Sequence, residues 1–234
     1  MSSEPGWDAM QLLAEPTRRA LLQTCRRAGS PLTREELATE VGISRRLAAF
    51  HLDLLADAGL LTVDYARPPG RSGPGAGRPA KRYAAADVDL EVSVPPRRYD
   101  VAARVMARGL AAASERGTDA LETTFDVAHE EGERIGKLRR TPGRMSAGAT
   151  TEAAMEVLTD LGYEPHRESS ARVQLCNCPF DSVVDVATDV VCGLNERFVA
   201  GVLDGIGGHR NVRAELDPAP DRCCVVLRNG GRVR

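Results

Sequence analysis

Apolar and polar residues between Thr33 and Leu61 alternate at helical spacing in two short runs. In the first run Thr33 and Glu36 have capping-box spacing, and Gly42 can end the helix in the left-handed conformation. Ser44 can cap the second run, where apolar residues three or four positions apart predict one buried face. That face would be formed by Leu47, Phe50, Leu54 and Ala58. Two short helices joined by a tight turn are typical of a helix-turn-helix.

The residues after this pair of helices have the composition of a β-hairpin. Leu60–Tyr65 and Lys81–Tyr83 predict two strands. The loop between them, ARPPGRSGPGAGRPA, carries arginines and no acidic residue, and it holds too much Gly and Pro to be regular. A basic hairpin directly after the second helix is the wing of a winged helix-turn-helix. Together with Arg45 and Arg46 on the free face of that helix, it predicts DNA binding.

A change in composition divides the chain after this hairpin. Ala86–Arg98 resembles an extended, proline-containing linker, so we expect one domain over residues 1–95 and a second over residues 96–234. A helix should begin at Tyr99 with an apolar face that either pairs two chains or packs within one. That face comprises Ala102, Val105, Met106, Gly109, Leu110 and Ala113. Another helix is expected over Thr118–Leu138, with its charged HEEGER segment facing solvent.

The C-terminal part predicts a small layer of helices and strands. A helix capped by Thr150 or Thr151 should run to Leu161, and Val173–Leu175 should form a strand. Further elements are expected over Val183–Val191, Leu194–Ile206, Val212–Leu216 and Cys224–Leu227. Cys192 would then lie in the turn between two helices. The predicted fold class is α+β, with an N-terminal winged helix-turn-helix domain, a helical segment and a small α/β domain that contains cysteines.

Composition and charge exclude several classes of protein. The 234 residues carry a formal net charge of −2, which argues against a generally basic nucleic-acid coat and is compatible with a local basic patch. No segment approaches the roughly twenty apolar residues of a membrane span, and no signal-peptide pattern opens the chain, so we expect a cytoplasmic protein without a membrane partner. Neither a phosphate-binding loop nor a convincing nucleophile–base pair is present, so an enzyme is not expected.

Cysteines are concentrated near the C-terminal end, where five of the six lie between residues 176 and 234. They are Cys176, Cys178, Cys192, Cys223 and Cys224. Their spacing is not that of a zinc finger or of a Cys-x-x-Cys redox motif. In a cytoplasmic protein we expect thiols, metal ligands or redox sensors rather than structural disulfides. Adjacent residues on a strand point to opposite faces, so only one of Cys223 and Cys224 would face a shared site.

Two groups of motifs resemble known families. AEPTRRALL, SRRLAAFHLDLLADAGLL and GRPAKRY resemble segments of the ArsR-type winged-helix repressors. Such a domain followed by NCPF, VCGLN and a late Cys-Cys pair resembles the SufR-like iron–sulfur regulators. This resemblance implies a sequence-specific repressor that acts as a homodimer. Its binding to a double-stranded DNA operator would respond to an iron–sulfur cluster, commonly 4Fe–4S, held by thiolates.

The resemblance also implies a set of ligands. Cys178, Cys192 and one residue of the Cys223–Cys224 pair would bind the cluster. The fourth ligand stays open among the other residue of that pair, a histidine, an exogenous molecule, Cys176 and Asp181. Zinc is an alternative, because several thiolates also suit a tetrahedral zinc site. A regulator that senses a small ligand, or that has a redox thiol switch and no cluster, is a further alternative.

Residues of the second helix and of the loop in the hairpin are the candidates for DNA contacts. Arg45 and Arg46 would reach base edges or phosphates in the major groove. Ser44 would bind a phosphate or simply cap the helix. His51 would approach the DNA backbone or pack inside the domain. Two loop arginines would enter the minor groove: Arg78 and, assisting it, Arg71.

Overall fold

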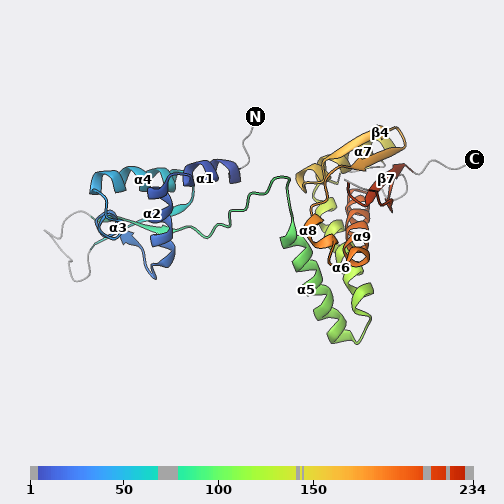
Figure 1. The fold of residues 1–234 in the computed structure, drawn as a ribbon, viewed down its shortest axis with the longest axis horizontal. Helices are drawn as coiled ribbons and strands as arrows, with labels where there is room; N and C mark the ends of the chain where they lie inside the picture. Colours follow the sequence, from blue (N-terminus) through green and yellow to red (C-terminus); the bar gives the residue numbers. More distant parts are fainter. Residues whose placement is uncertain are drawn as a thin grey trace, which may run out of the picture. The chain divides into compact units, whose positions relative to one another are not determined.

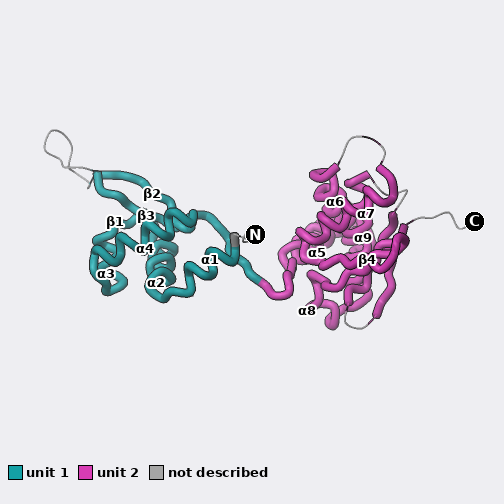
Figure 2. Tube along the Cα trace, turned by 90° about the horizontal axis from the view of Figure 1, so that it is seen from above, with its two compact units in different colours: residues 1–92 teal, residues 93–234 magenta. Residues whose placement is uncertain are grey.

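The computed structural model describes residues 5–67, 79–140, 143, 145–207, 212–219 and 222–229. The chain folds into two compact units, residues 1–92 and residues 93–234, which Figure 2 shows in different colours. Both units combine helices with an antiparallel sheet. Each unit has its own hydrophobic core, and each is described by itself.

The N-terminal unit contains four helices and a three-stranded sheet among its described residues. The helices are α1 (Pro5–Leu13), α2 (Pro16–Arg27), α3 (Arg34–Val41) and α4 (Arg45–Asp57). The strands are β1 (Leu32–Thr33), β2 (Leu61–Ala66) and β3 (Ala80–Ala85), in the order β1-β3-β2. β2 and β3 pair antiparallel from Leu61 opposite Ala85 to Ala66 opposite Ala80, which confirms the predicted hairpin.

Local signals in the sequence place the two helices of the helix-turn-helix. The Thr33 hydroxyl accepts from the Glu36 backbone N–H while the Glu36 carboxylate accepts from the Thr33 N–H, so the predicted capping box is confirmed. Gly42 ends α3 with φ 72°, in the left-handed region. The Ser44 hydroxyl accepts from the Leu47 N–H and caps α4, as expected. The tight turn is therefore built from residues 42–44.

The buried face of α4 differs from the predicted one. Ala48, His51, Leu52 and Leu55 face the core, whereas the predicted core residues Leu47 and Phe50 are 40% and 59% exposed. Both sets have helical spacing, so periodicity alone does not choose between them. The choice follows from packing, because the first set contacts the core formed by α2 and α3. The expectation for Leu47 and Phe50 was wrong.

The C-terminal unit packs helices around a four-stranded antiparallel sheet. Its helices are α5 (Tyr99–Arg116), α6 (Ala120–Lys137), α7 (Ala147–Asp160), α8 (Asp181–Val184) and α9 (Thr188–Ile206). Its strands are β4 (Pro165–Ser169), β5 (Arg172–Leu175), β6 (Val212–Leu216) and β7 (Val225–Asn229), in the order β4-β5-β7-β6. The pairing of β6 with β7 confirms the two C-terminal strands predicted from the sequence.

Helices α6 and α9 lie side by side and form the centre of this unit (Figure 1). Glycines let their backbones approach closely. A Cβ atom at Gly132 would lie 2.0 Å from the Phe198 carbonyl oxygen, and one at Gly201 would lie 2.0 Å from the His129 carbonyl oxygen. Neither backbone atom can move aside as a flexible side chain could. These two glycines are therefore required by packing rather than by a turn.

Several predicted helix positions in this unit were wrong. Ser146 caps α7, and the predicted cap residues Thr150 and Thr151 are buried inside the helix. Cys192 lies within the continuous helix α9 instead of in a turn. The next residue, Gly193, also lies inside this helix and leaves room for the ring of Phe125 on α6, 2.6 Å from where a Cβ would stand.

The apolar face predicted for α5 and the charged face predicted for α6 differ from the expectation in how exposed their residues are. Leu110 on α5 is 58% exposed, although the other predicted face residues of this helix are buried or half-buried. Within the HEEGER segment Glu131 is buried and pairs with Arg134 at 2.7 Å and Arg108 at 3.3 Å. The segment is therefore only partly the solvated face we expected, because one side of α6 faces α9 and α5.

Candidate DNA-binding surface and cysteine cluster

The outer face of α4 carries the candidate DNA contacts that the structure describes. Arg46 and Phe50 project from the side opposite the buried residues and are exposed. Arg45 is exposed as well and forms an ion pair at 2.5 Å with Glu35 of α3. Ser44 uses its hydroxyl to cap the helix, which supports the capping alternative for this residue. The first turn of α4 thus presents two cationic side chains.

Asp53 ties α4 to strand β3 of the hairpin. Its carboxylate accepts hydrogen bonds from Lys81 Nζ at 2.5 Å and from the Tyr83 hydroxyl at 3.1 Å. The hydrogen bond from Lys81 lowers the pKa of Asp53 and the same bond raises the pKa of Lys81, so both groups stay charged near neutral pH. This contact fixes the hairpin strands with respect to the helix.

The other three candidate DNA contacts are either buried or outside the described residues. His51 is buried in the N-terminal core, and its Nδ1 atom has no hydrogen-bond partner among the described residues. This position fits the packing alternative for His51. Arg71 and Arg78 lie outside the described residues, and their minor-groove contacts stay predictions.

Four cysteines of the C-terminal unit come together at one cavity of about 370 Å³. Cys178 lies between β5 and α8, Cys192 lies on α9, and Cys223 and Cys224 directly precede β7. We call these four residues the cysteine cluster. All four are buried, and the cavity that they line also contains charged and apolar side chains. Its other lining residues include Asp181, Asp189, Arg222, Val184 and Leu216.

A buried amide organises the cysteine cluster. Asn195 of α9 is fully buried, and its Nδ2 atom lies 3.1 Å from the Cys223 sulfur and 3.9 Å from the Cys178 sulfur. Its Oδ1 atom accepts a hydrogen bond from the Tyr163 hydroxyl at 2.5 Å. Because that hydroxyl can only donate to Oδ1, it orients the amide with its N–H groups toward the sulfur atoms.

The four thiols fall into donors and acceptors of hydrogen bonds. The Cys223 thiol lies in hydrogen-bonding contact with Cys178 and Cys224 and has one proton to share between them, which raises the pKa of Cys223 and lowers that of Cys178. Cys224 accepts from Cys223 and Cys192, which lowers the pKa of Cys224 to about 6. Burial raises the pKa of Cys192 to about 12. These contacts therefore favour ionisation of Cys178 and Cys224 over that of Cys192 and Cys223.

These contacts correct one expectation about the vicinal pair. Cys223 and Cys224 both contribute to the cluster, whereas strand alternation predicted that only one would. The reason is that β7 begins at Val225, so the pair lies before the strand and does not follow its alternation.

The remaining two cysteines do not line the cavity of the cysteine cluster. Cys176 is exposed and lines a neighbouring cavity of about 390 Å³ together with Cys178, Asp181 and Arg222. Cys25 is buried on α2 in the N-terminal unit, where burial raises its pKa to about 11. Cys25 therefore packs as a small apolar side chain.

The cysteine cluster matches a thiophilic metal group in chemistry but is not preformed for one. Thiolates are the donors that iron–sulfur clusters and zinc favour, and the cavity brings four sulfur atoms together. Within the part of the chain that the structure describes, no three His, Cys, Asp or Glu side chains are arranged to hold a metal ion. Binding a metal group would therefore require the four thiols to rearrange and to exchange their mutual hydrogen bonds for metal bonds.

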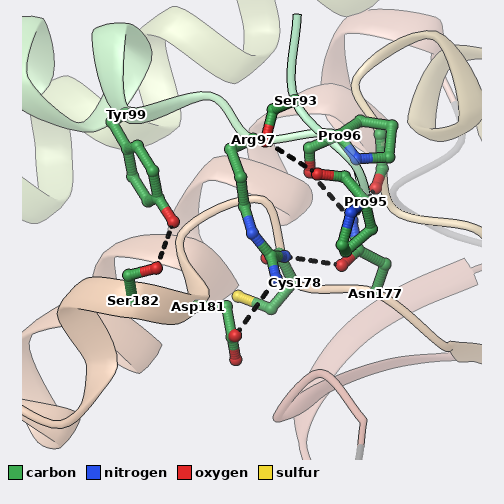
Figure 3. A network of polar contacts seen from close by, with 10 residues as sticks. Ser93, Pro95, Pro96, Arg97, Tyr99, Asn177, Cys178, Asp181 and Ser182 are labelled. Atoms are coloured by element: carbon green, nitrogen blue, oxygen red, sulfur yellow. Dashed lines mark hydrogen bonds and ion pairs between the residues drawn. The ribbon is translucent and has the colours of Figure 1, made fainter.

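The segment before α5 is fastened to the loop that carries Cys178 (Figure 3). Arg97 Nη1 donates to Asn177 Oδ1 at 2.6 Å and to the Cys178 carbonyl at 2.7 Å, while Nη2 lies 3.2 Å from Asp181 Oδ2. Asn177 Nδ2 donates back to the Pro96 carbonyl at 3.0 Å. The backbone N–H of Arg98 also donates to the Pro179 carbonyl at 3.0 Å.

Sequence analysis missed four of the residues that build this region. Asn177 and Asn195 lie in the NCPF and VCGLN motifs, which offered a signal for both. Tyr163 and Arg97 stand outside any motif, and nothing in their immediate sequence marks them. Their roles depend on contacts between segments far apart in the chain.

Comparison with known proteins supports one part of this picture. The sequence model of a helix-turn-helix domain matches residues 13–64, which include α2, α3 and α4. No curated protein and no solved structure matches the chain. None of the described helices is long and apolar enough to cross a membrane. The chain therefore contains a helix-turn-helix domain, which supports a DNA-binding transcription regulator.

Proposed function

We propose that this protein is a dimeric repressor whose binding to a DNA operator is controlled by an iron–sulfur cluster at Cys178, Cys192, Cys223 and Cys224. The observation that carries the proposal is that four thiols from three separate segments line one cavity. They do so in a chain that also contains a helix-turn-helix domain. No catalytic role is proposed for any residue.

On the DNA side, the first turn of α4 would enter the major groove of the operator. Arg45 and Arg46 would contact base edges or phosphates there, and Arg71 and Arg78 of the hairpin loop would reach the minor groove. Two copies would place their α4 helices about 34–36 Å apart on a pseudo-palindromic site. The exposed Leu110 on α5 supports pairing of two chains through that helix.

On the sensor side, hydrogen bonds lower the pKa of two of the four thiols, Cys178 and Cys224. Asn195 supplies a further N–H donor to sulfur, and Tyr163 holds it in place. When bound, the cluster supplies a group whose integrity and oxidation state respond to oxidants. Burial of the four sulfur atoms limits access of water to that group.

A thiol switch without a cluster is the second candidate. The contacts of Cys223 with Cys178 and of Cys192 with Cys224 favour it, because each pair brings a thiol against a thiolate. Oxidation of such a thiol–thiolate pair to a disulfide would transfer two electrons to an oxidant and release one proton to water. Zinc, or a small ligand in the cavity of about 370 Å³, is a further alternative for the same site.

Anaerobic purification separates these candidates. The cluster proposal predicts brown protein with broad absorption near ~400 nm and with iron and acid-labile sulfide, all lost in a Cys178→Ala variant. Cys25→Ala is the matched control, since this thiol lies in the other unit, and it should keep the colour. Colourless protein with stoichiometric zinc, or metal-free protein that resists cluster reconstitution, would contradict the cluster.

A further inference from the structure

We infer that Arg97 is a positioning residue that couples the cysteine cluster to the segment before α5. Through its contacts, a chemical change at Cys178 would alter how firmly residues 96–98 are held. Residues 86–98, which we call the linker, form neither helix nor strand and connect β3 with α5. This inference rests on the proposed function only in taking the cysteine cluster as the control point. It assigns a role to residues that carry no thiol and touch no DNA.

The guanidinium of Arg97 joins the linker to both sides of Cys178. Its fork reaches Asn177 Oδ1, the Cys178 carbonyl and Asp181 Oδ2, so it spans the loop on which Cys178 lies (Figure 3). The Arg97 side chain is only 15% exposed. A partly buried fork with three acceptors is a directional contact, because a planar guanidinium fixes the position of each acceptor.

Backbone contacts make the attachment stiff. Asn177 donates to the Pro96 carbonyl and to the Gly162 carbonyl, which ties the linker to the end of α7 as well. Gly162 has φ 88°, and a Cβ there would lie 2.7 Å from the Pro96 side chain. Pro96 therefore packs directly on that glycine. A shift of the Cys178 loop must either carry the linker with it or break these contacts.

Cys178 takes part both in the cysteine cluster and in the contacts that hold the linker. Its sulfur accepts from Cys223 within the cysteine cluster, while its carbonyl accepts from Arg97. Ligation, oxidation or chemical modification of Cys178 would move its sulfur. Each would therefore act on a residue whose carbonyl is hydrogen-bonded directly to the linker. The expected consequence is a change in how firmly residues 96–98 are held.

Amide hydrogen exchange at Arg98 tests the inference without DNA, because its N–H donates to the Pro179 carbonyl. Methyl methanethiosulfonate adds a methylthio group to thiolates, and mass spectrometry identifies which cysteines react. In the wild type we expect modification of Cys178 to speed exchange at Arg98 about tenfold or more. A Cys178→Met variant, which enlarges the side chain in place, gives the same test where the reagent does not reach the thiol.

Variants of Arg97 separate coupling from a general loss of structure. In Arg97→Gln, exchange at Arg98 should be fast in both thiol states, and Arg97→Lys should not restore the difference, because a single ammonium lacks the fork. Arg139→Gln, which removes an exposed ion pair with Asp160, is the control and should behave as the wild type. The inference would be overturned if the exchange rate at Arg98 were the same with and without modification of Cys178. It would also be overturned if the change in exchange rate persisted in Arg97→Gln. Operator affinity that ignores the thiols would instead count against the proposed function.

A second, independent observation concerns DNA recognition. We propose that Phe50 contacts the C5-methyl group of thymine in the major groove and so contributes to the choice of operator. Phe50 is 59% exposed on the same face of α4 as Arg46, four residues earlier. The helix-turn-helix match includes α4, and the cationic first turn of this helix complements DNA. Apolar contact with the thymine methyl group is an established mode of base readout.

Its exposure distinguishes Phe50 from an ordinary core residue. Among its described neighbours it makes an edge-on ring contact with His51 at 5.2 Å, which leaves most of the ring in solvent. Asp57 is exposed on the same face at the end of α4, whereas the carboxylate of Asp53 is paired with Lys81 at 2.5 Å. Phe50 lies about one turn after Arg46, at the end of the helix that carries the arginines.

Replacement of thymine by deoxyuridine removes only the methyl group and tests this contact. An operator is first selected from random DNA with the full-length protein, and each thymine is then replaced in turn. We expect one position per half-site at which wild-type affinity falls about three- to fivefold, and at which Phe50→Ala shows no further loss. Val186→Ala removes an exposed side chain of the other unit and should keep the sensitivity. The contact would be refuted if no replacement of thymine by deoxyuridine changed the affinity of the wild type. It would also be refuted if Phe50→Ala lost as much affinity as the wild type on the same replacement.

Discussion

The outer face of α4 and the cysteine cluster differ in how far apart in the sequence their residues lie. The candidate DNA contacts on α4 come from a single helix of 13 residues, and their exposure follows from its turn and caps. The cysteine cluster brings together a loop, a helix and the start of a strand, separated by up to 46 positions between Cys178 and Cys224. One site depends on local structure, whereas the other depends on the packing of a whole unit.

This difference has a consequence for how each site fails. A substitution on the surface of α4 removes a contact and leaves the unit folded. A substitution in the packing of α6 and α9 should disperse the four cysteines without touching any of them, because Cys192 and Asn195 are both carried by α9. The two units also have separate cores, so damage to one need not reach the other.

The largest effect is expected from Gly201→Leu. Its side chain would begin 2.0 Å from the His129 carbonyl oxygen of α6, and backbone atoms cannot yield without separating the helices. We expect the C-terminal unit to lose about 3 kcal/mol or more of its free energy of unfolding. Chemical denaturation followed by circular dichroism measures this.

Gly148→Ala provides the matched control for Gly201→Leu. A Cβ at Gly148 meets only the Ser146 hydroxyl at 4.0 Å, so this helical glycine has room for a side chain. The control should be neutral or slightly stabilising. Equal effects of the two substitutions would show that α6 and α9 are not held by close backbone contact.

The next largest effect is expected from Arg46→Ala. Loss of this exposed cation at the start of α4 should weaken operator binding by about 1–3 kcal/mol if it reads a base, and should reduce the salt dependence if it binds a phosphate. Titration of the operator at several salt concentrations distinguishes these outcomes. Arg139→Ala, in the other unit, should leave both quantities unchanged. Affinity of Arg46→Ala equal to the wild type at every salt concentration would remove Arg46 from the DNA surface.

Asn195→Leu should destabilise the C-terminal unit by about 1–3 kcal/mol, because it leaves the buried Tyr163 hydroxyl without its acceptor. The double variant Asn195→Leu with Tyr163→Phe removes both partners and should recover part of that loss. Denaturation of the two single variants and the double variant gives the coupling. Additive losses would mean that the Tyr163–Asn195 hydrogen bond does not position the amide at the cysteine cluster.

The smallest effect is expected from Glu131→Gln. Arg134 lowers the pKa of Glu131, so its carboxylate contributes stability at neutral pH that is lost as the pH falls through the folded-state pKa, below the ordinary value of 4.5. We expect a difference of about 1 kcal/mol from the wild type at pH 7 that shrinks toward zero in acid. Thermal unfolding between pH 7 and pH 3 measures it, and a difference that grows in acid would have the wrong sign.

The sequence predicted the local features of the N-terminal unit well. Thr33, Glu36, Gly42 and Ser44 act within a few residues of themselves, and their roles as caps and turn were confirmed. The hairpin strands were also found as expected. Such features depend on backbone conformation and short-range hydrogen bonds, which neighbouring residues specify.

Features that depend on distant contacts were harder to predict. Phe50 and Leu52 have the same helical spacing pattern, and only the position of α2 and α3 decides which of them is buried. Cys192 was expected in a turn, but it lies in a continuous helix in which the adjacent Gly193 packs against Phe125, 68 residues earlier in the chain. For the same reason the cysteines could be identified as a set, but the contacts that Tyr163 and Arg97 make around them could not be predicted.

The most direct test of the proposed function is operator affinity measured on one anaerobic preparation of the full-length protein, before and after exposure to air. The account predicts that affinity changes at least about tenfold with loss of the cluster, and that Cys178→Ala has one fixed affinity in both conditions. Cys25→Ala should respond as the wild type does. Identical affinity of the wild-type protein in the two conditions would show that the cysteine cluster does not control DNA binding.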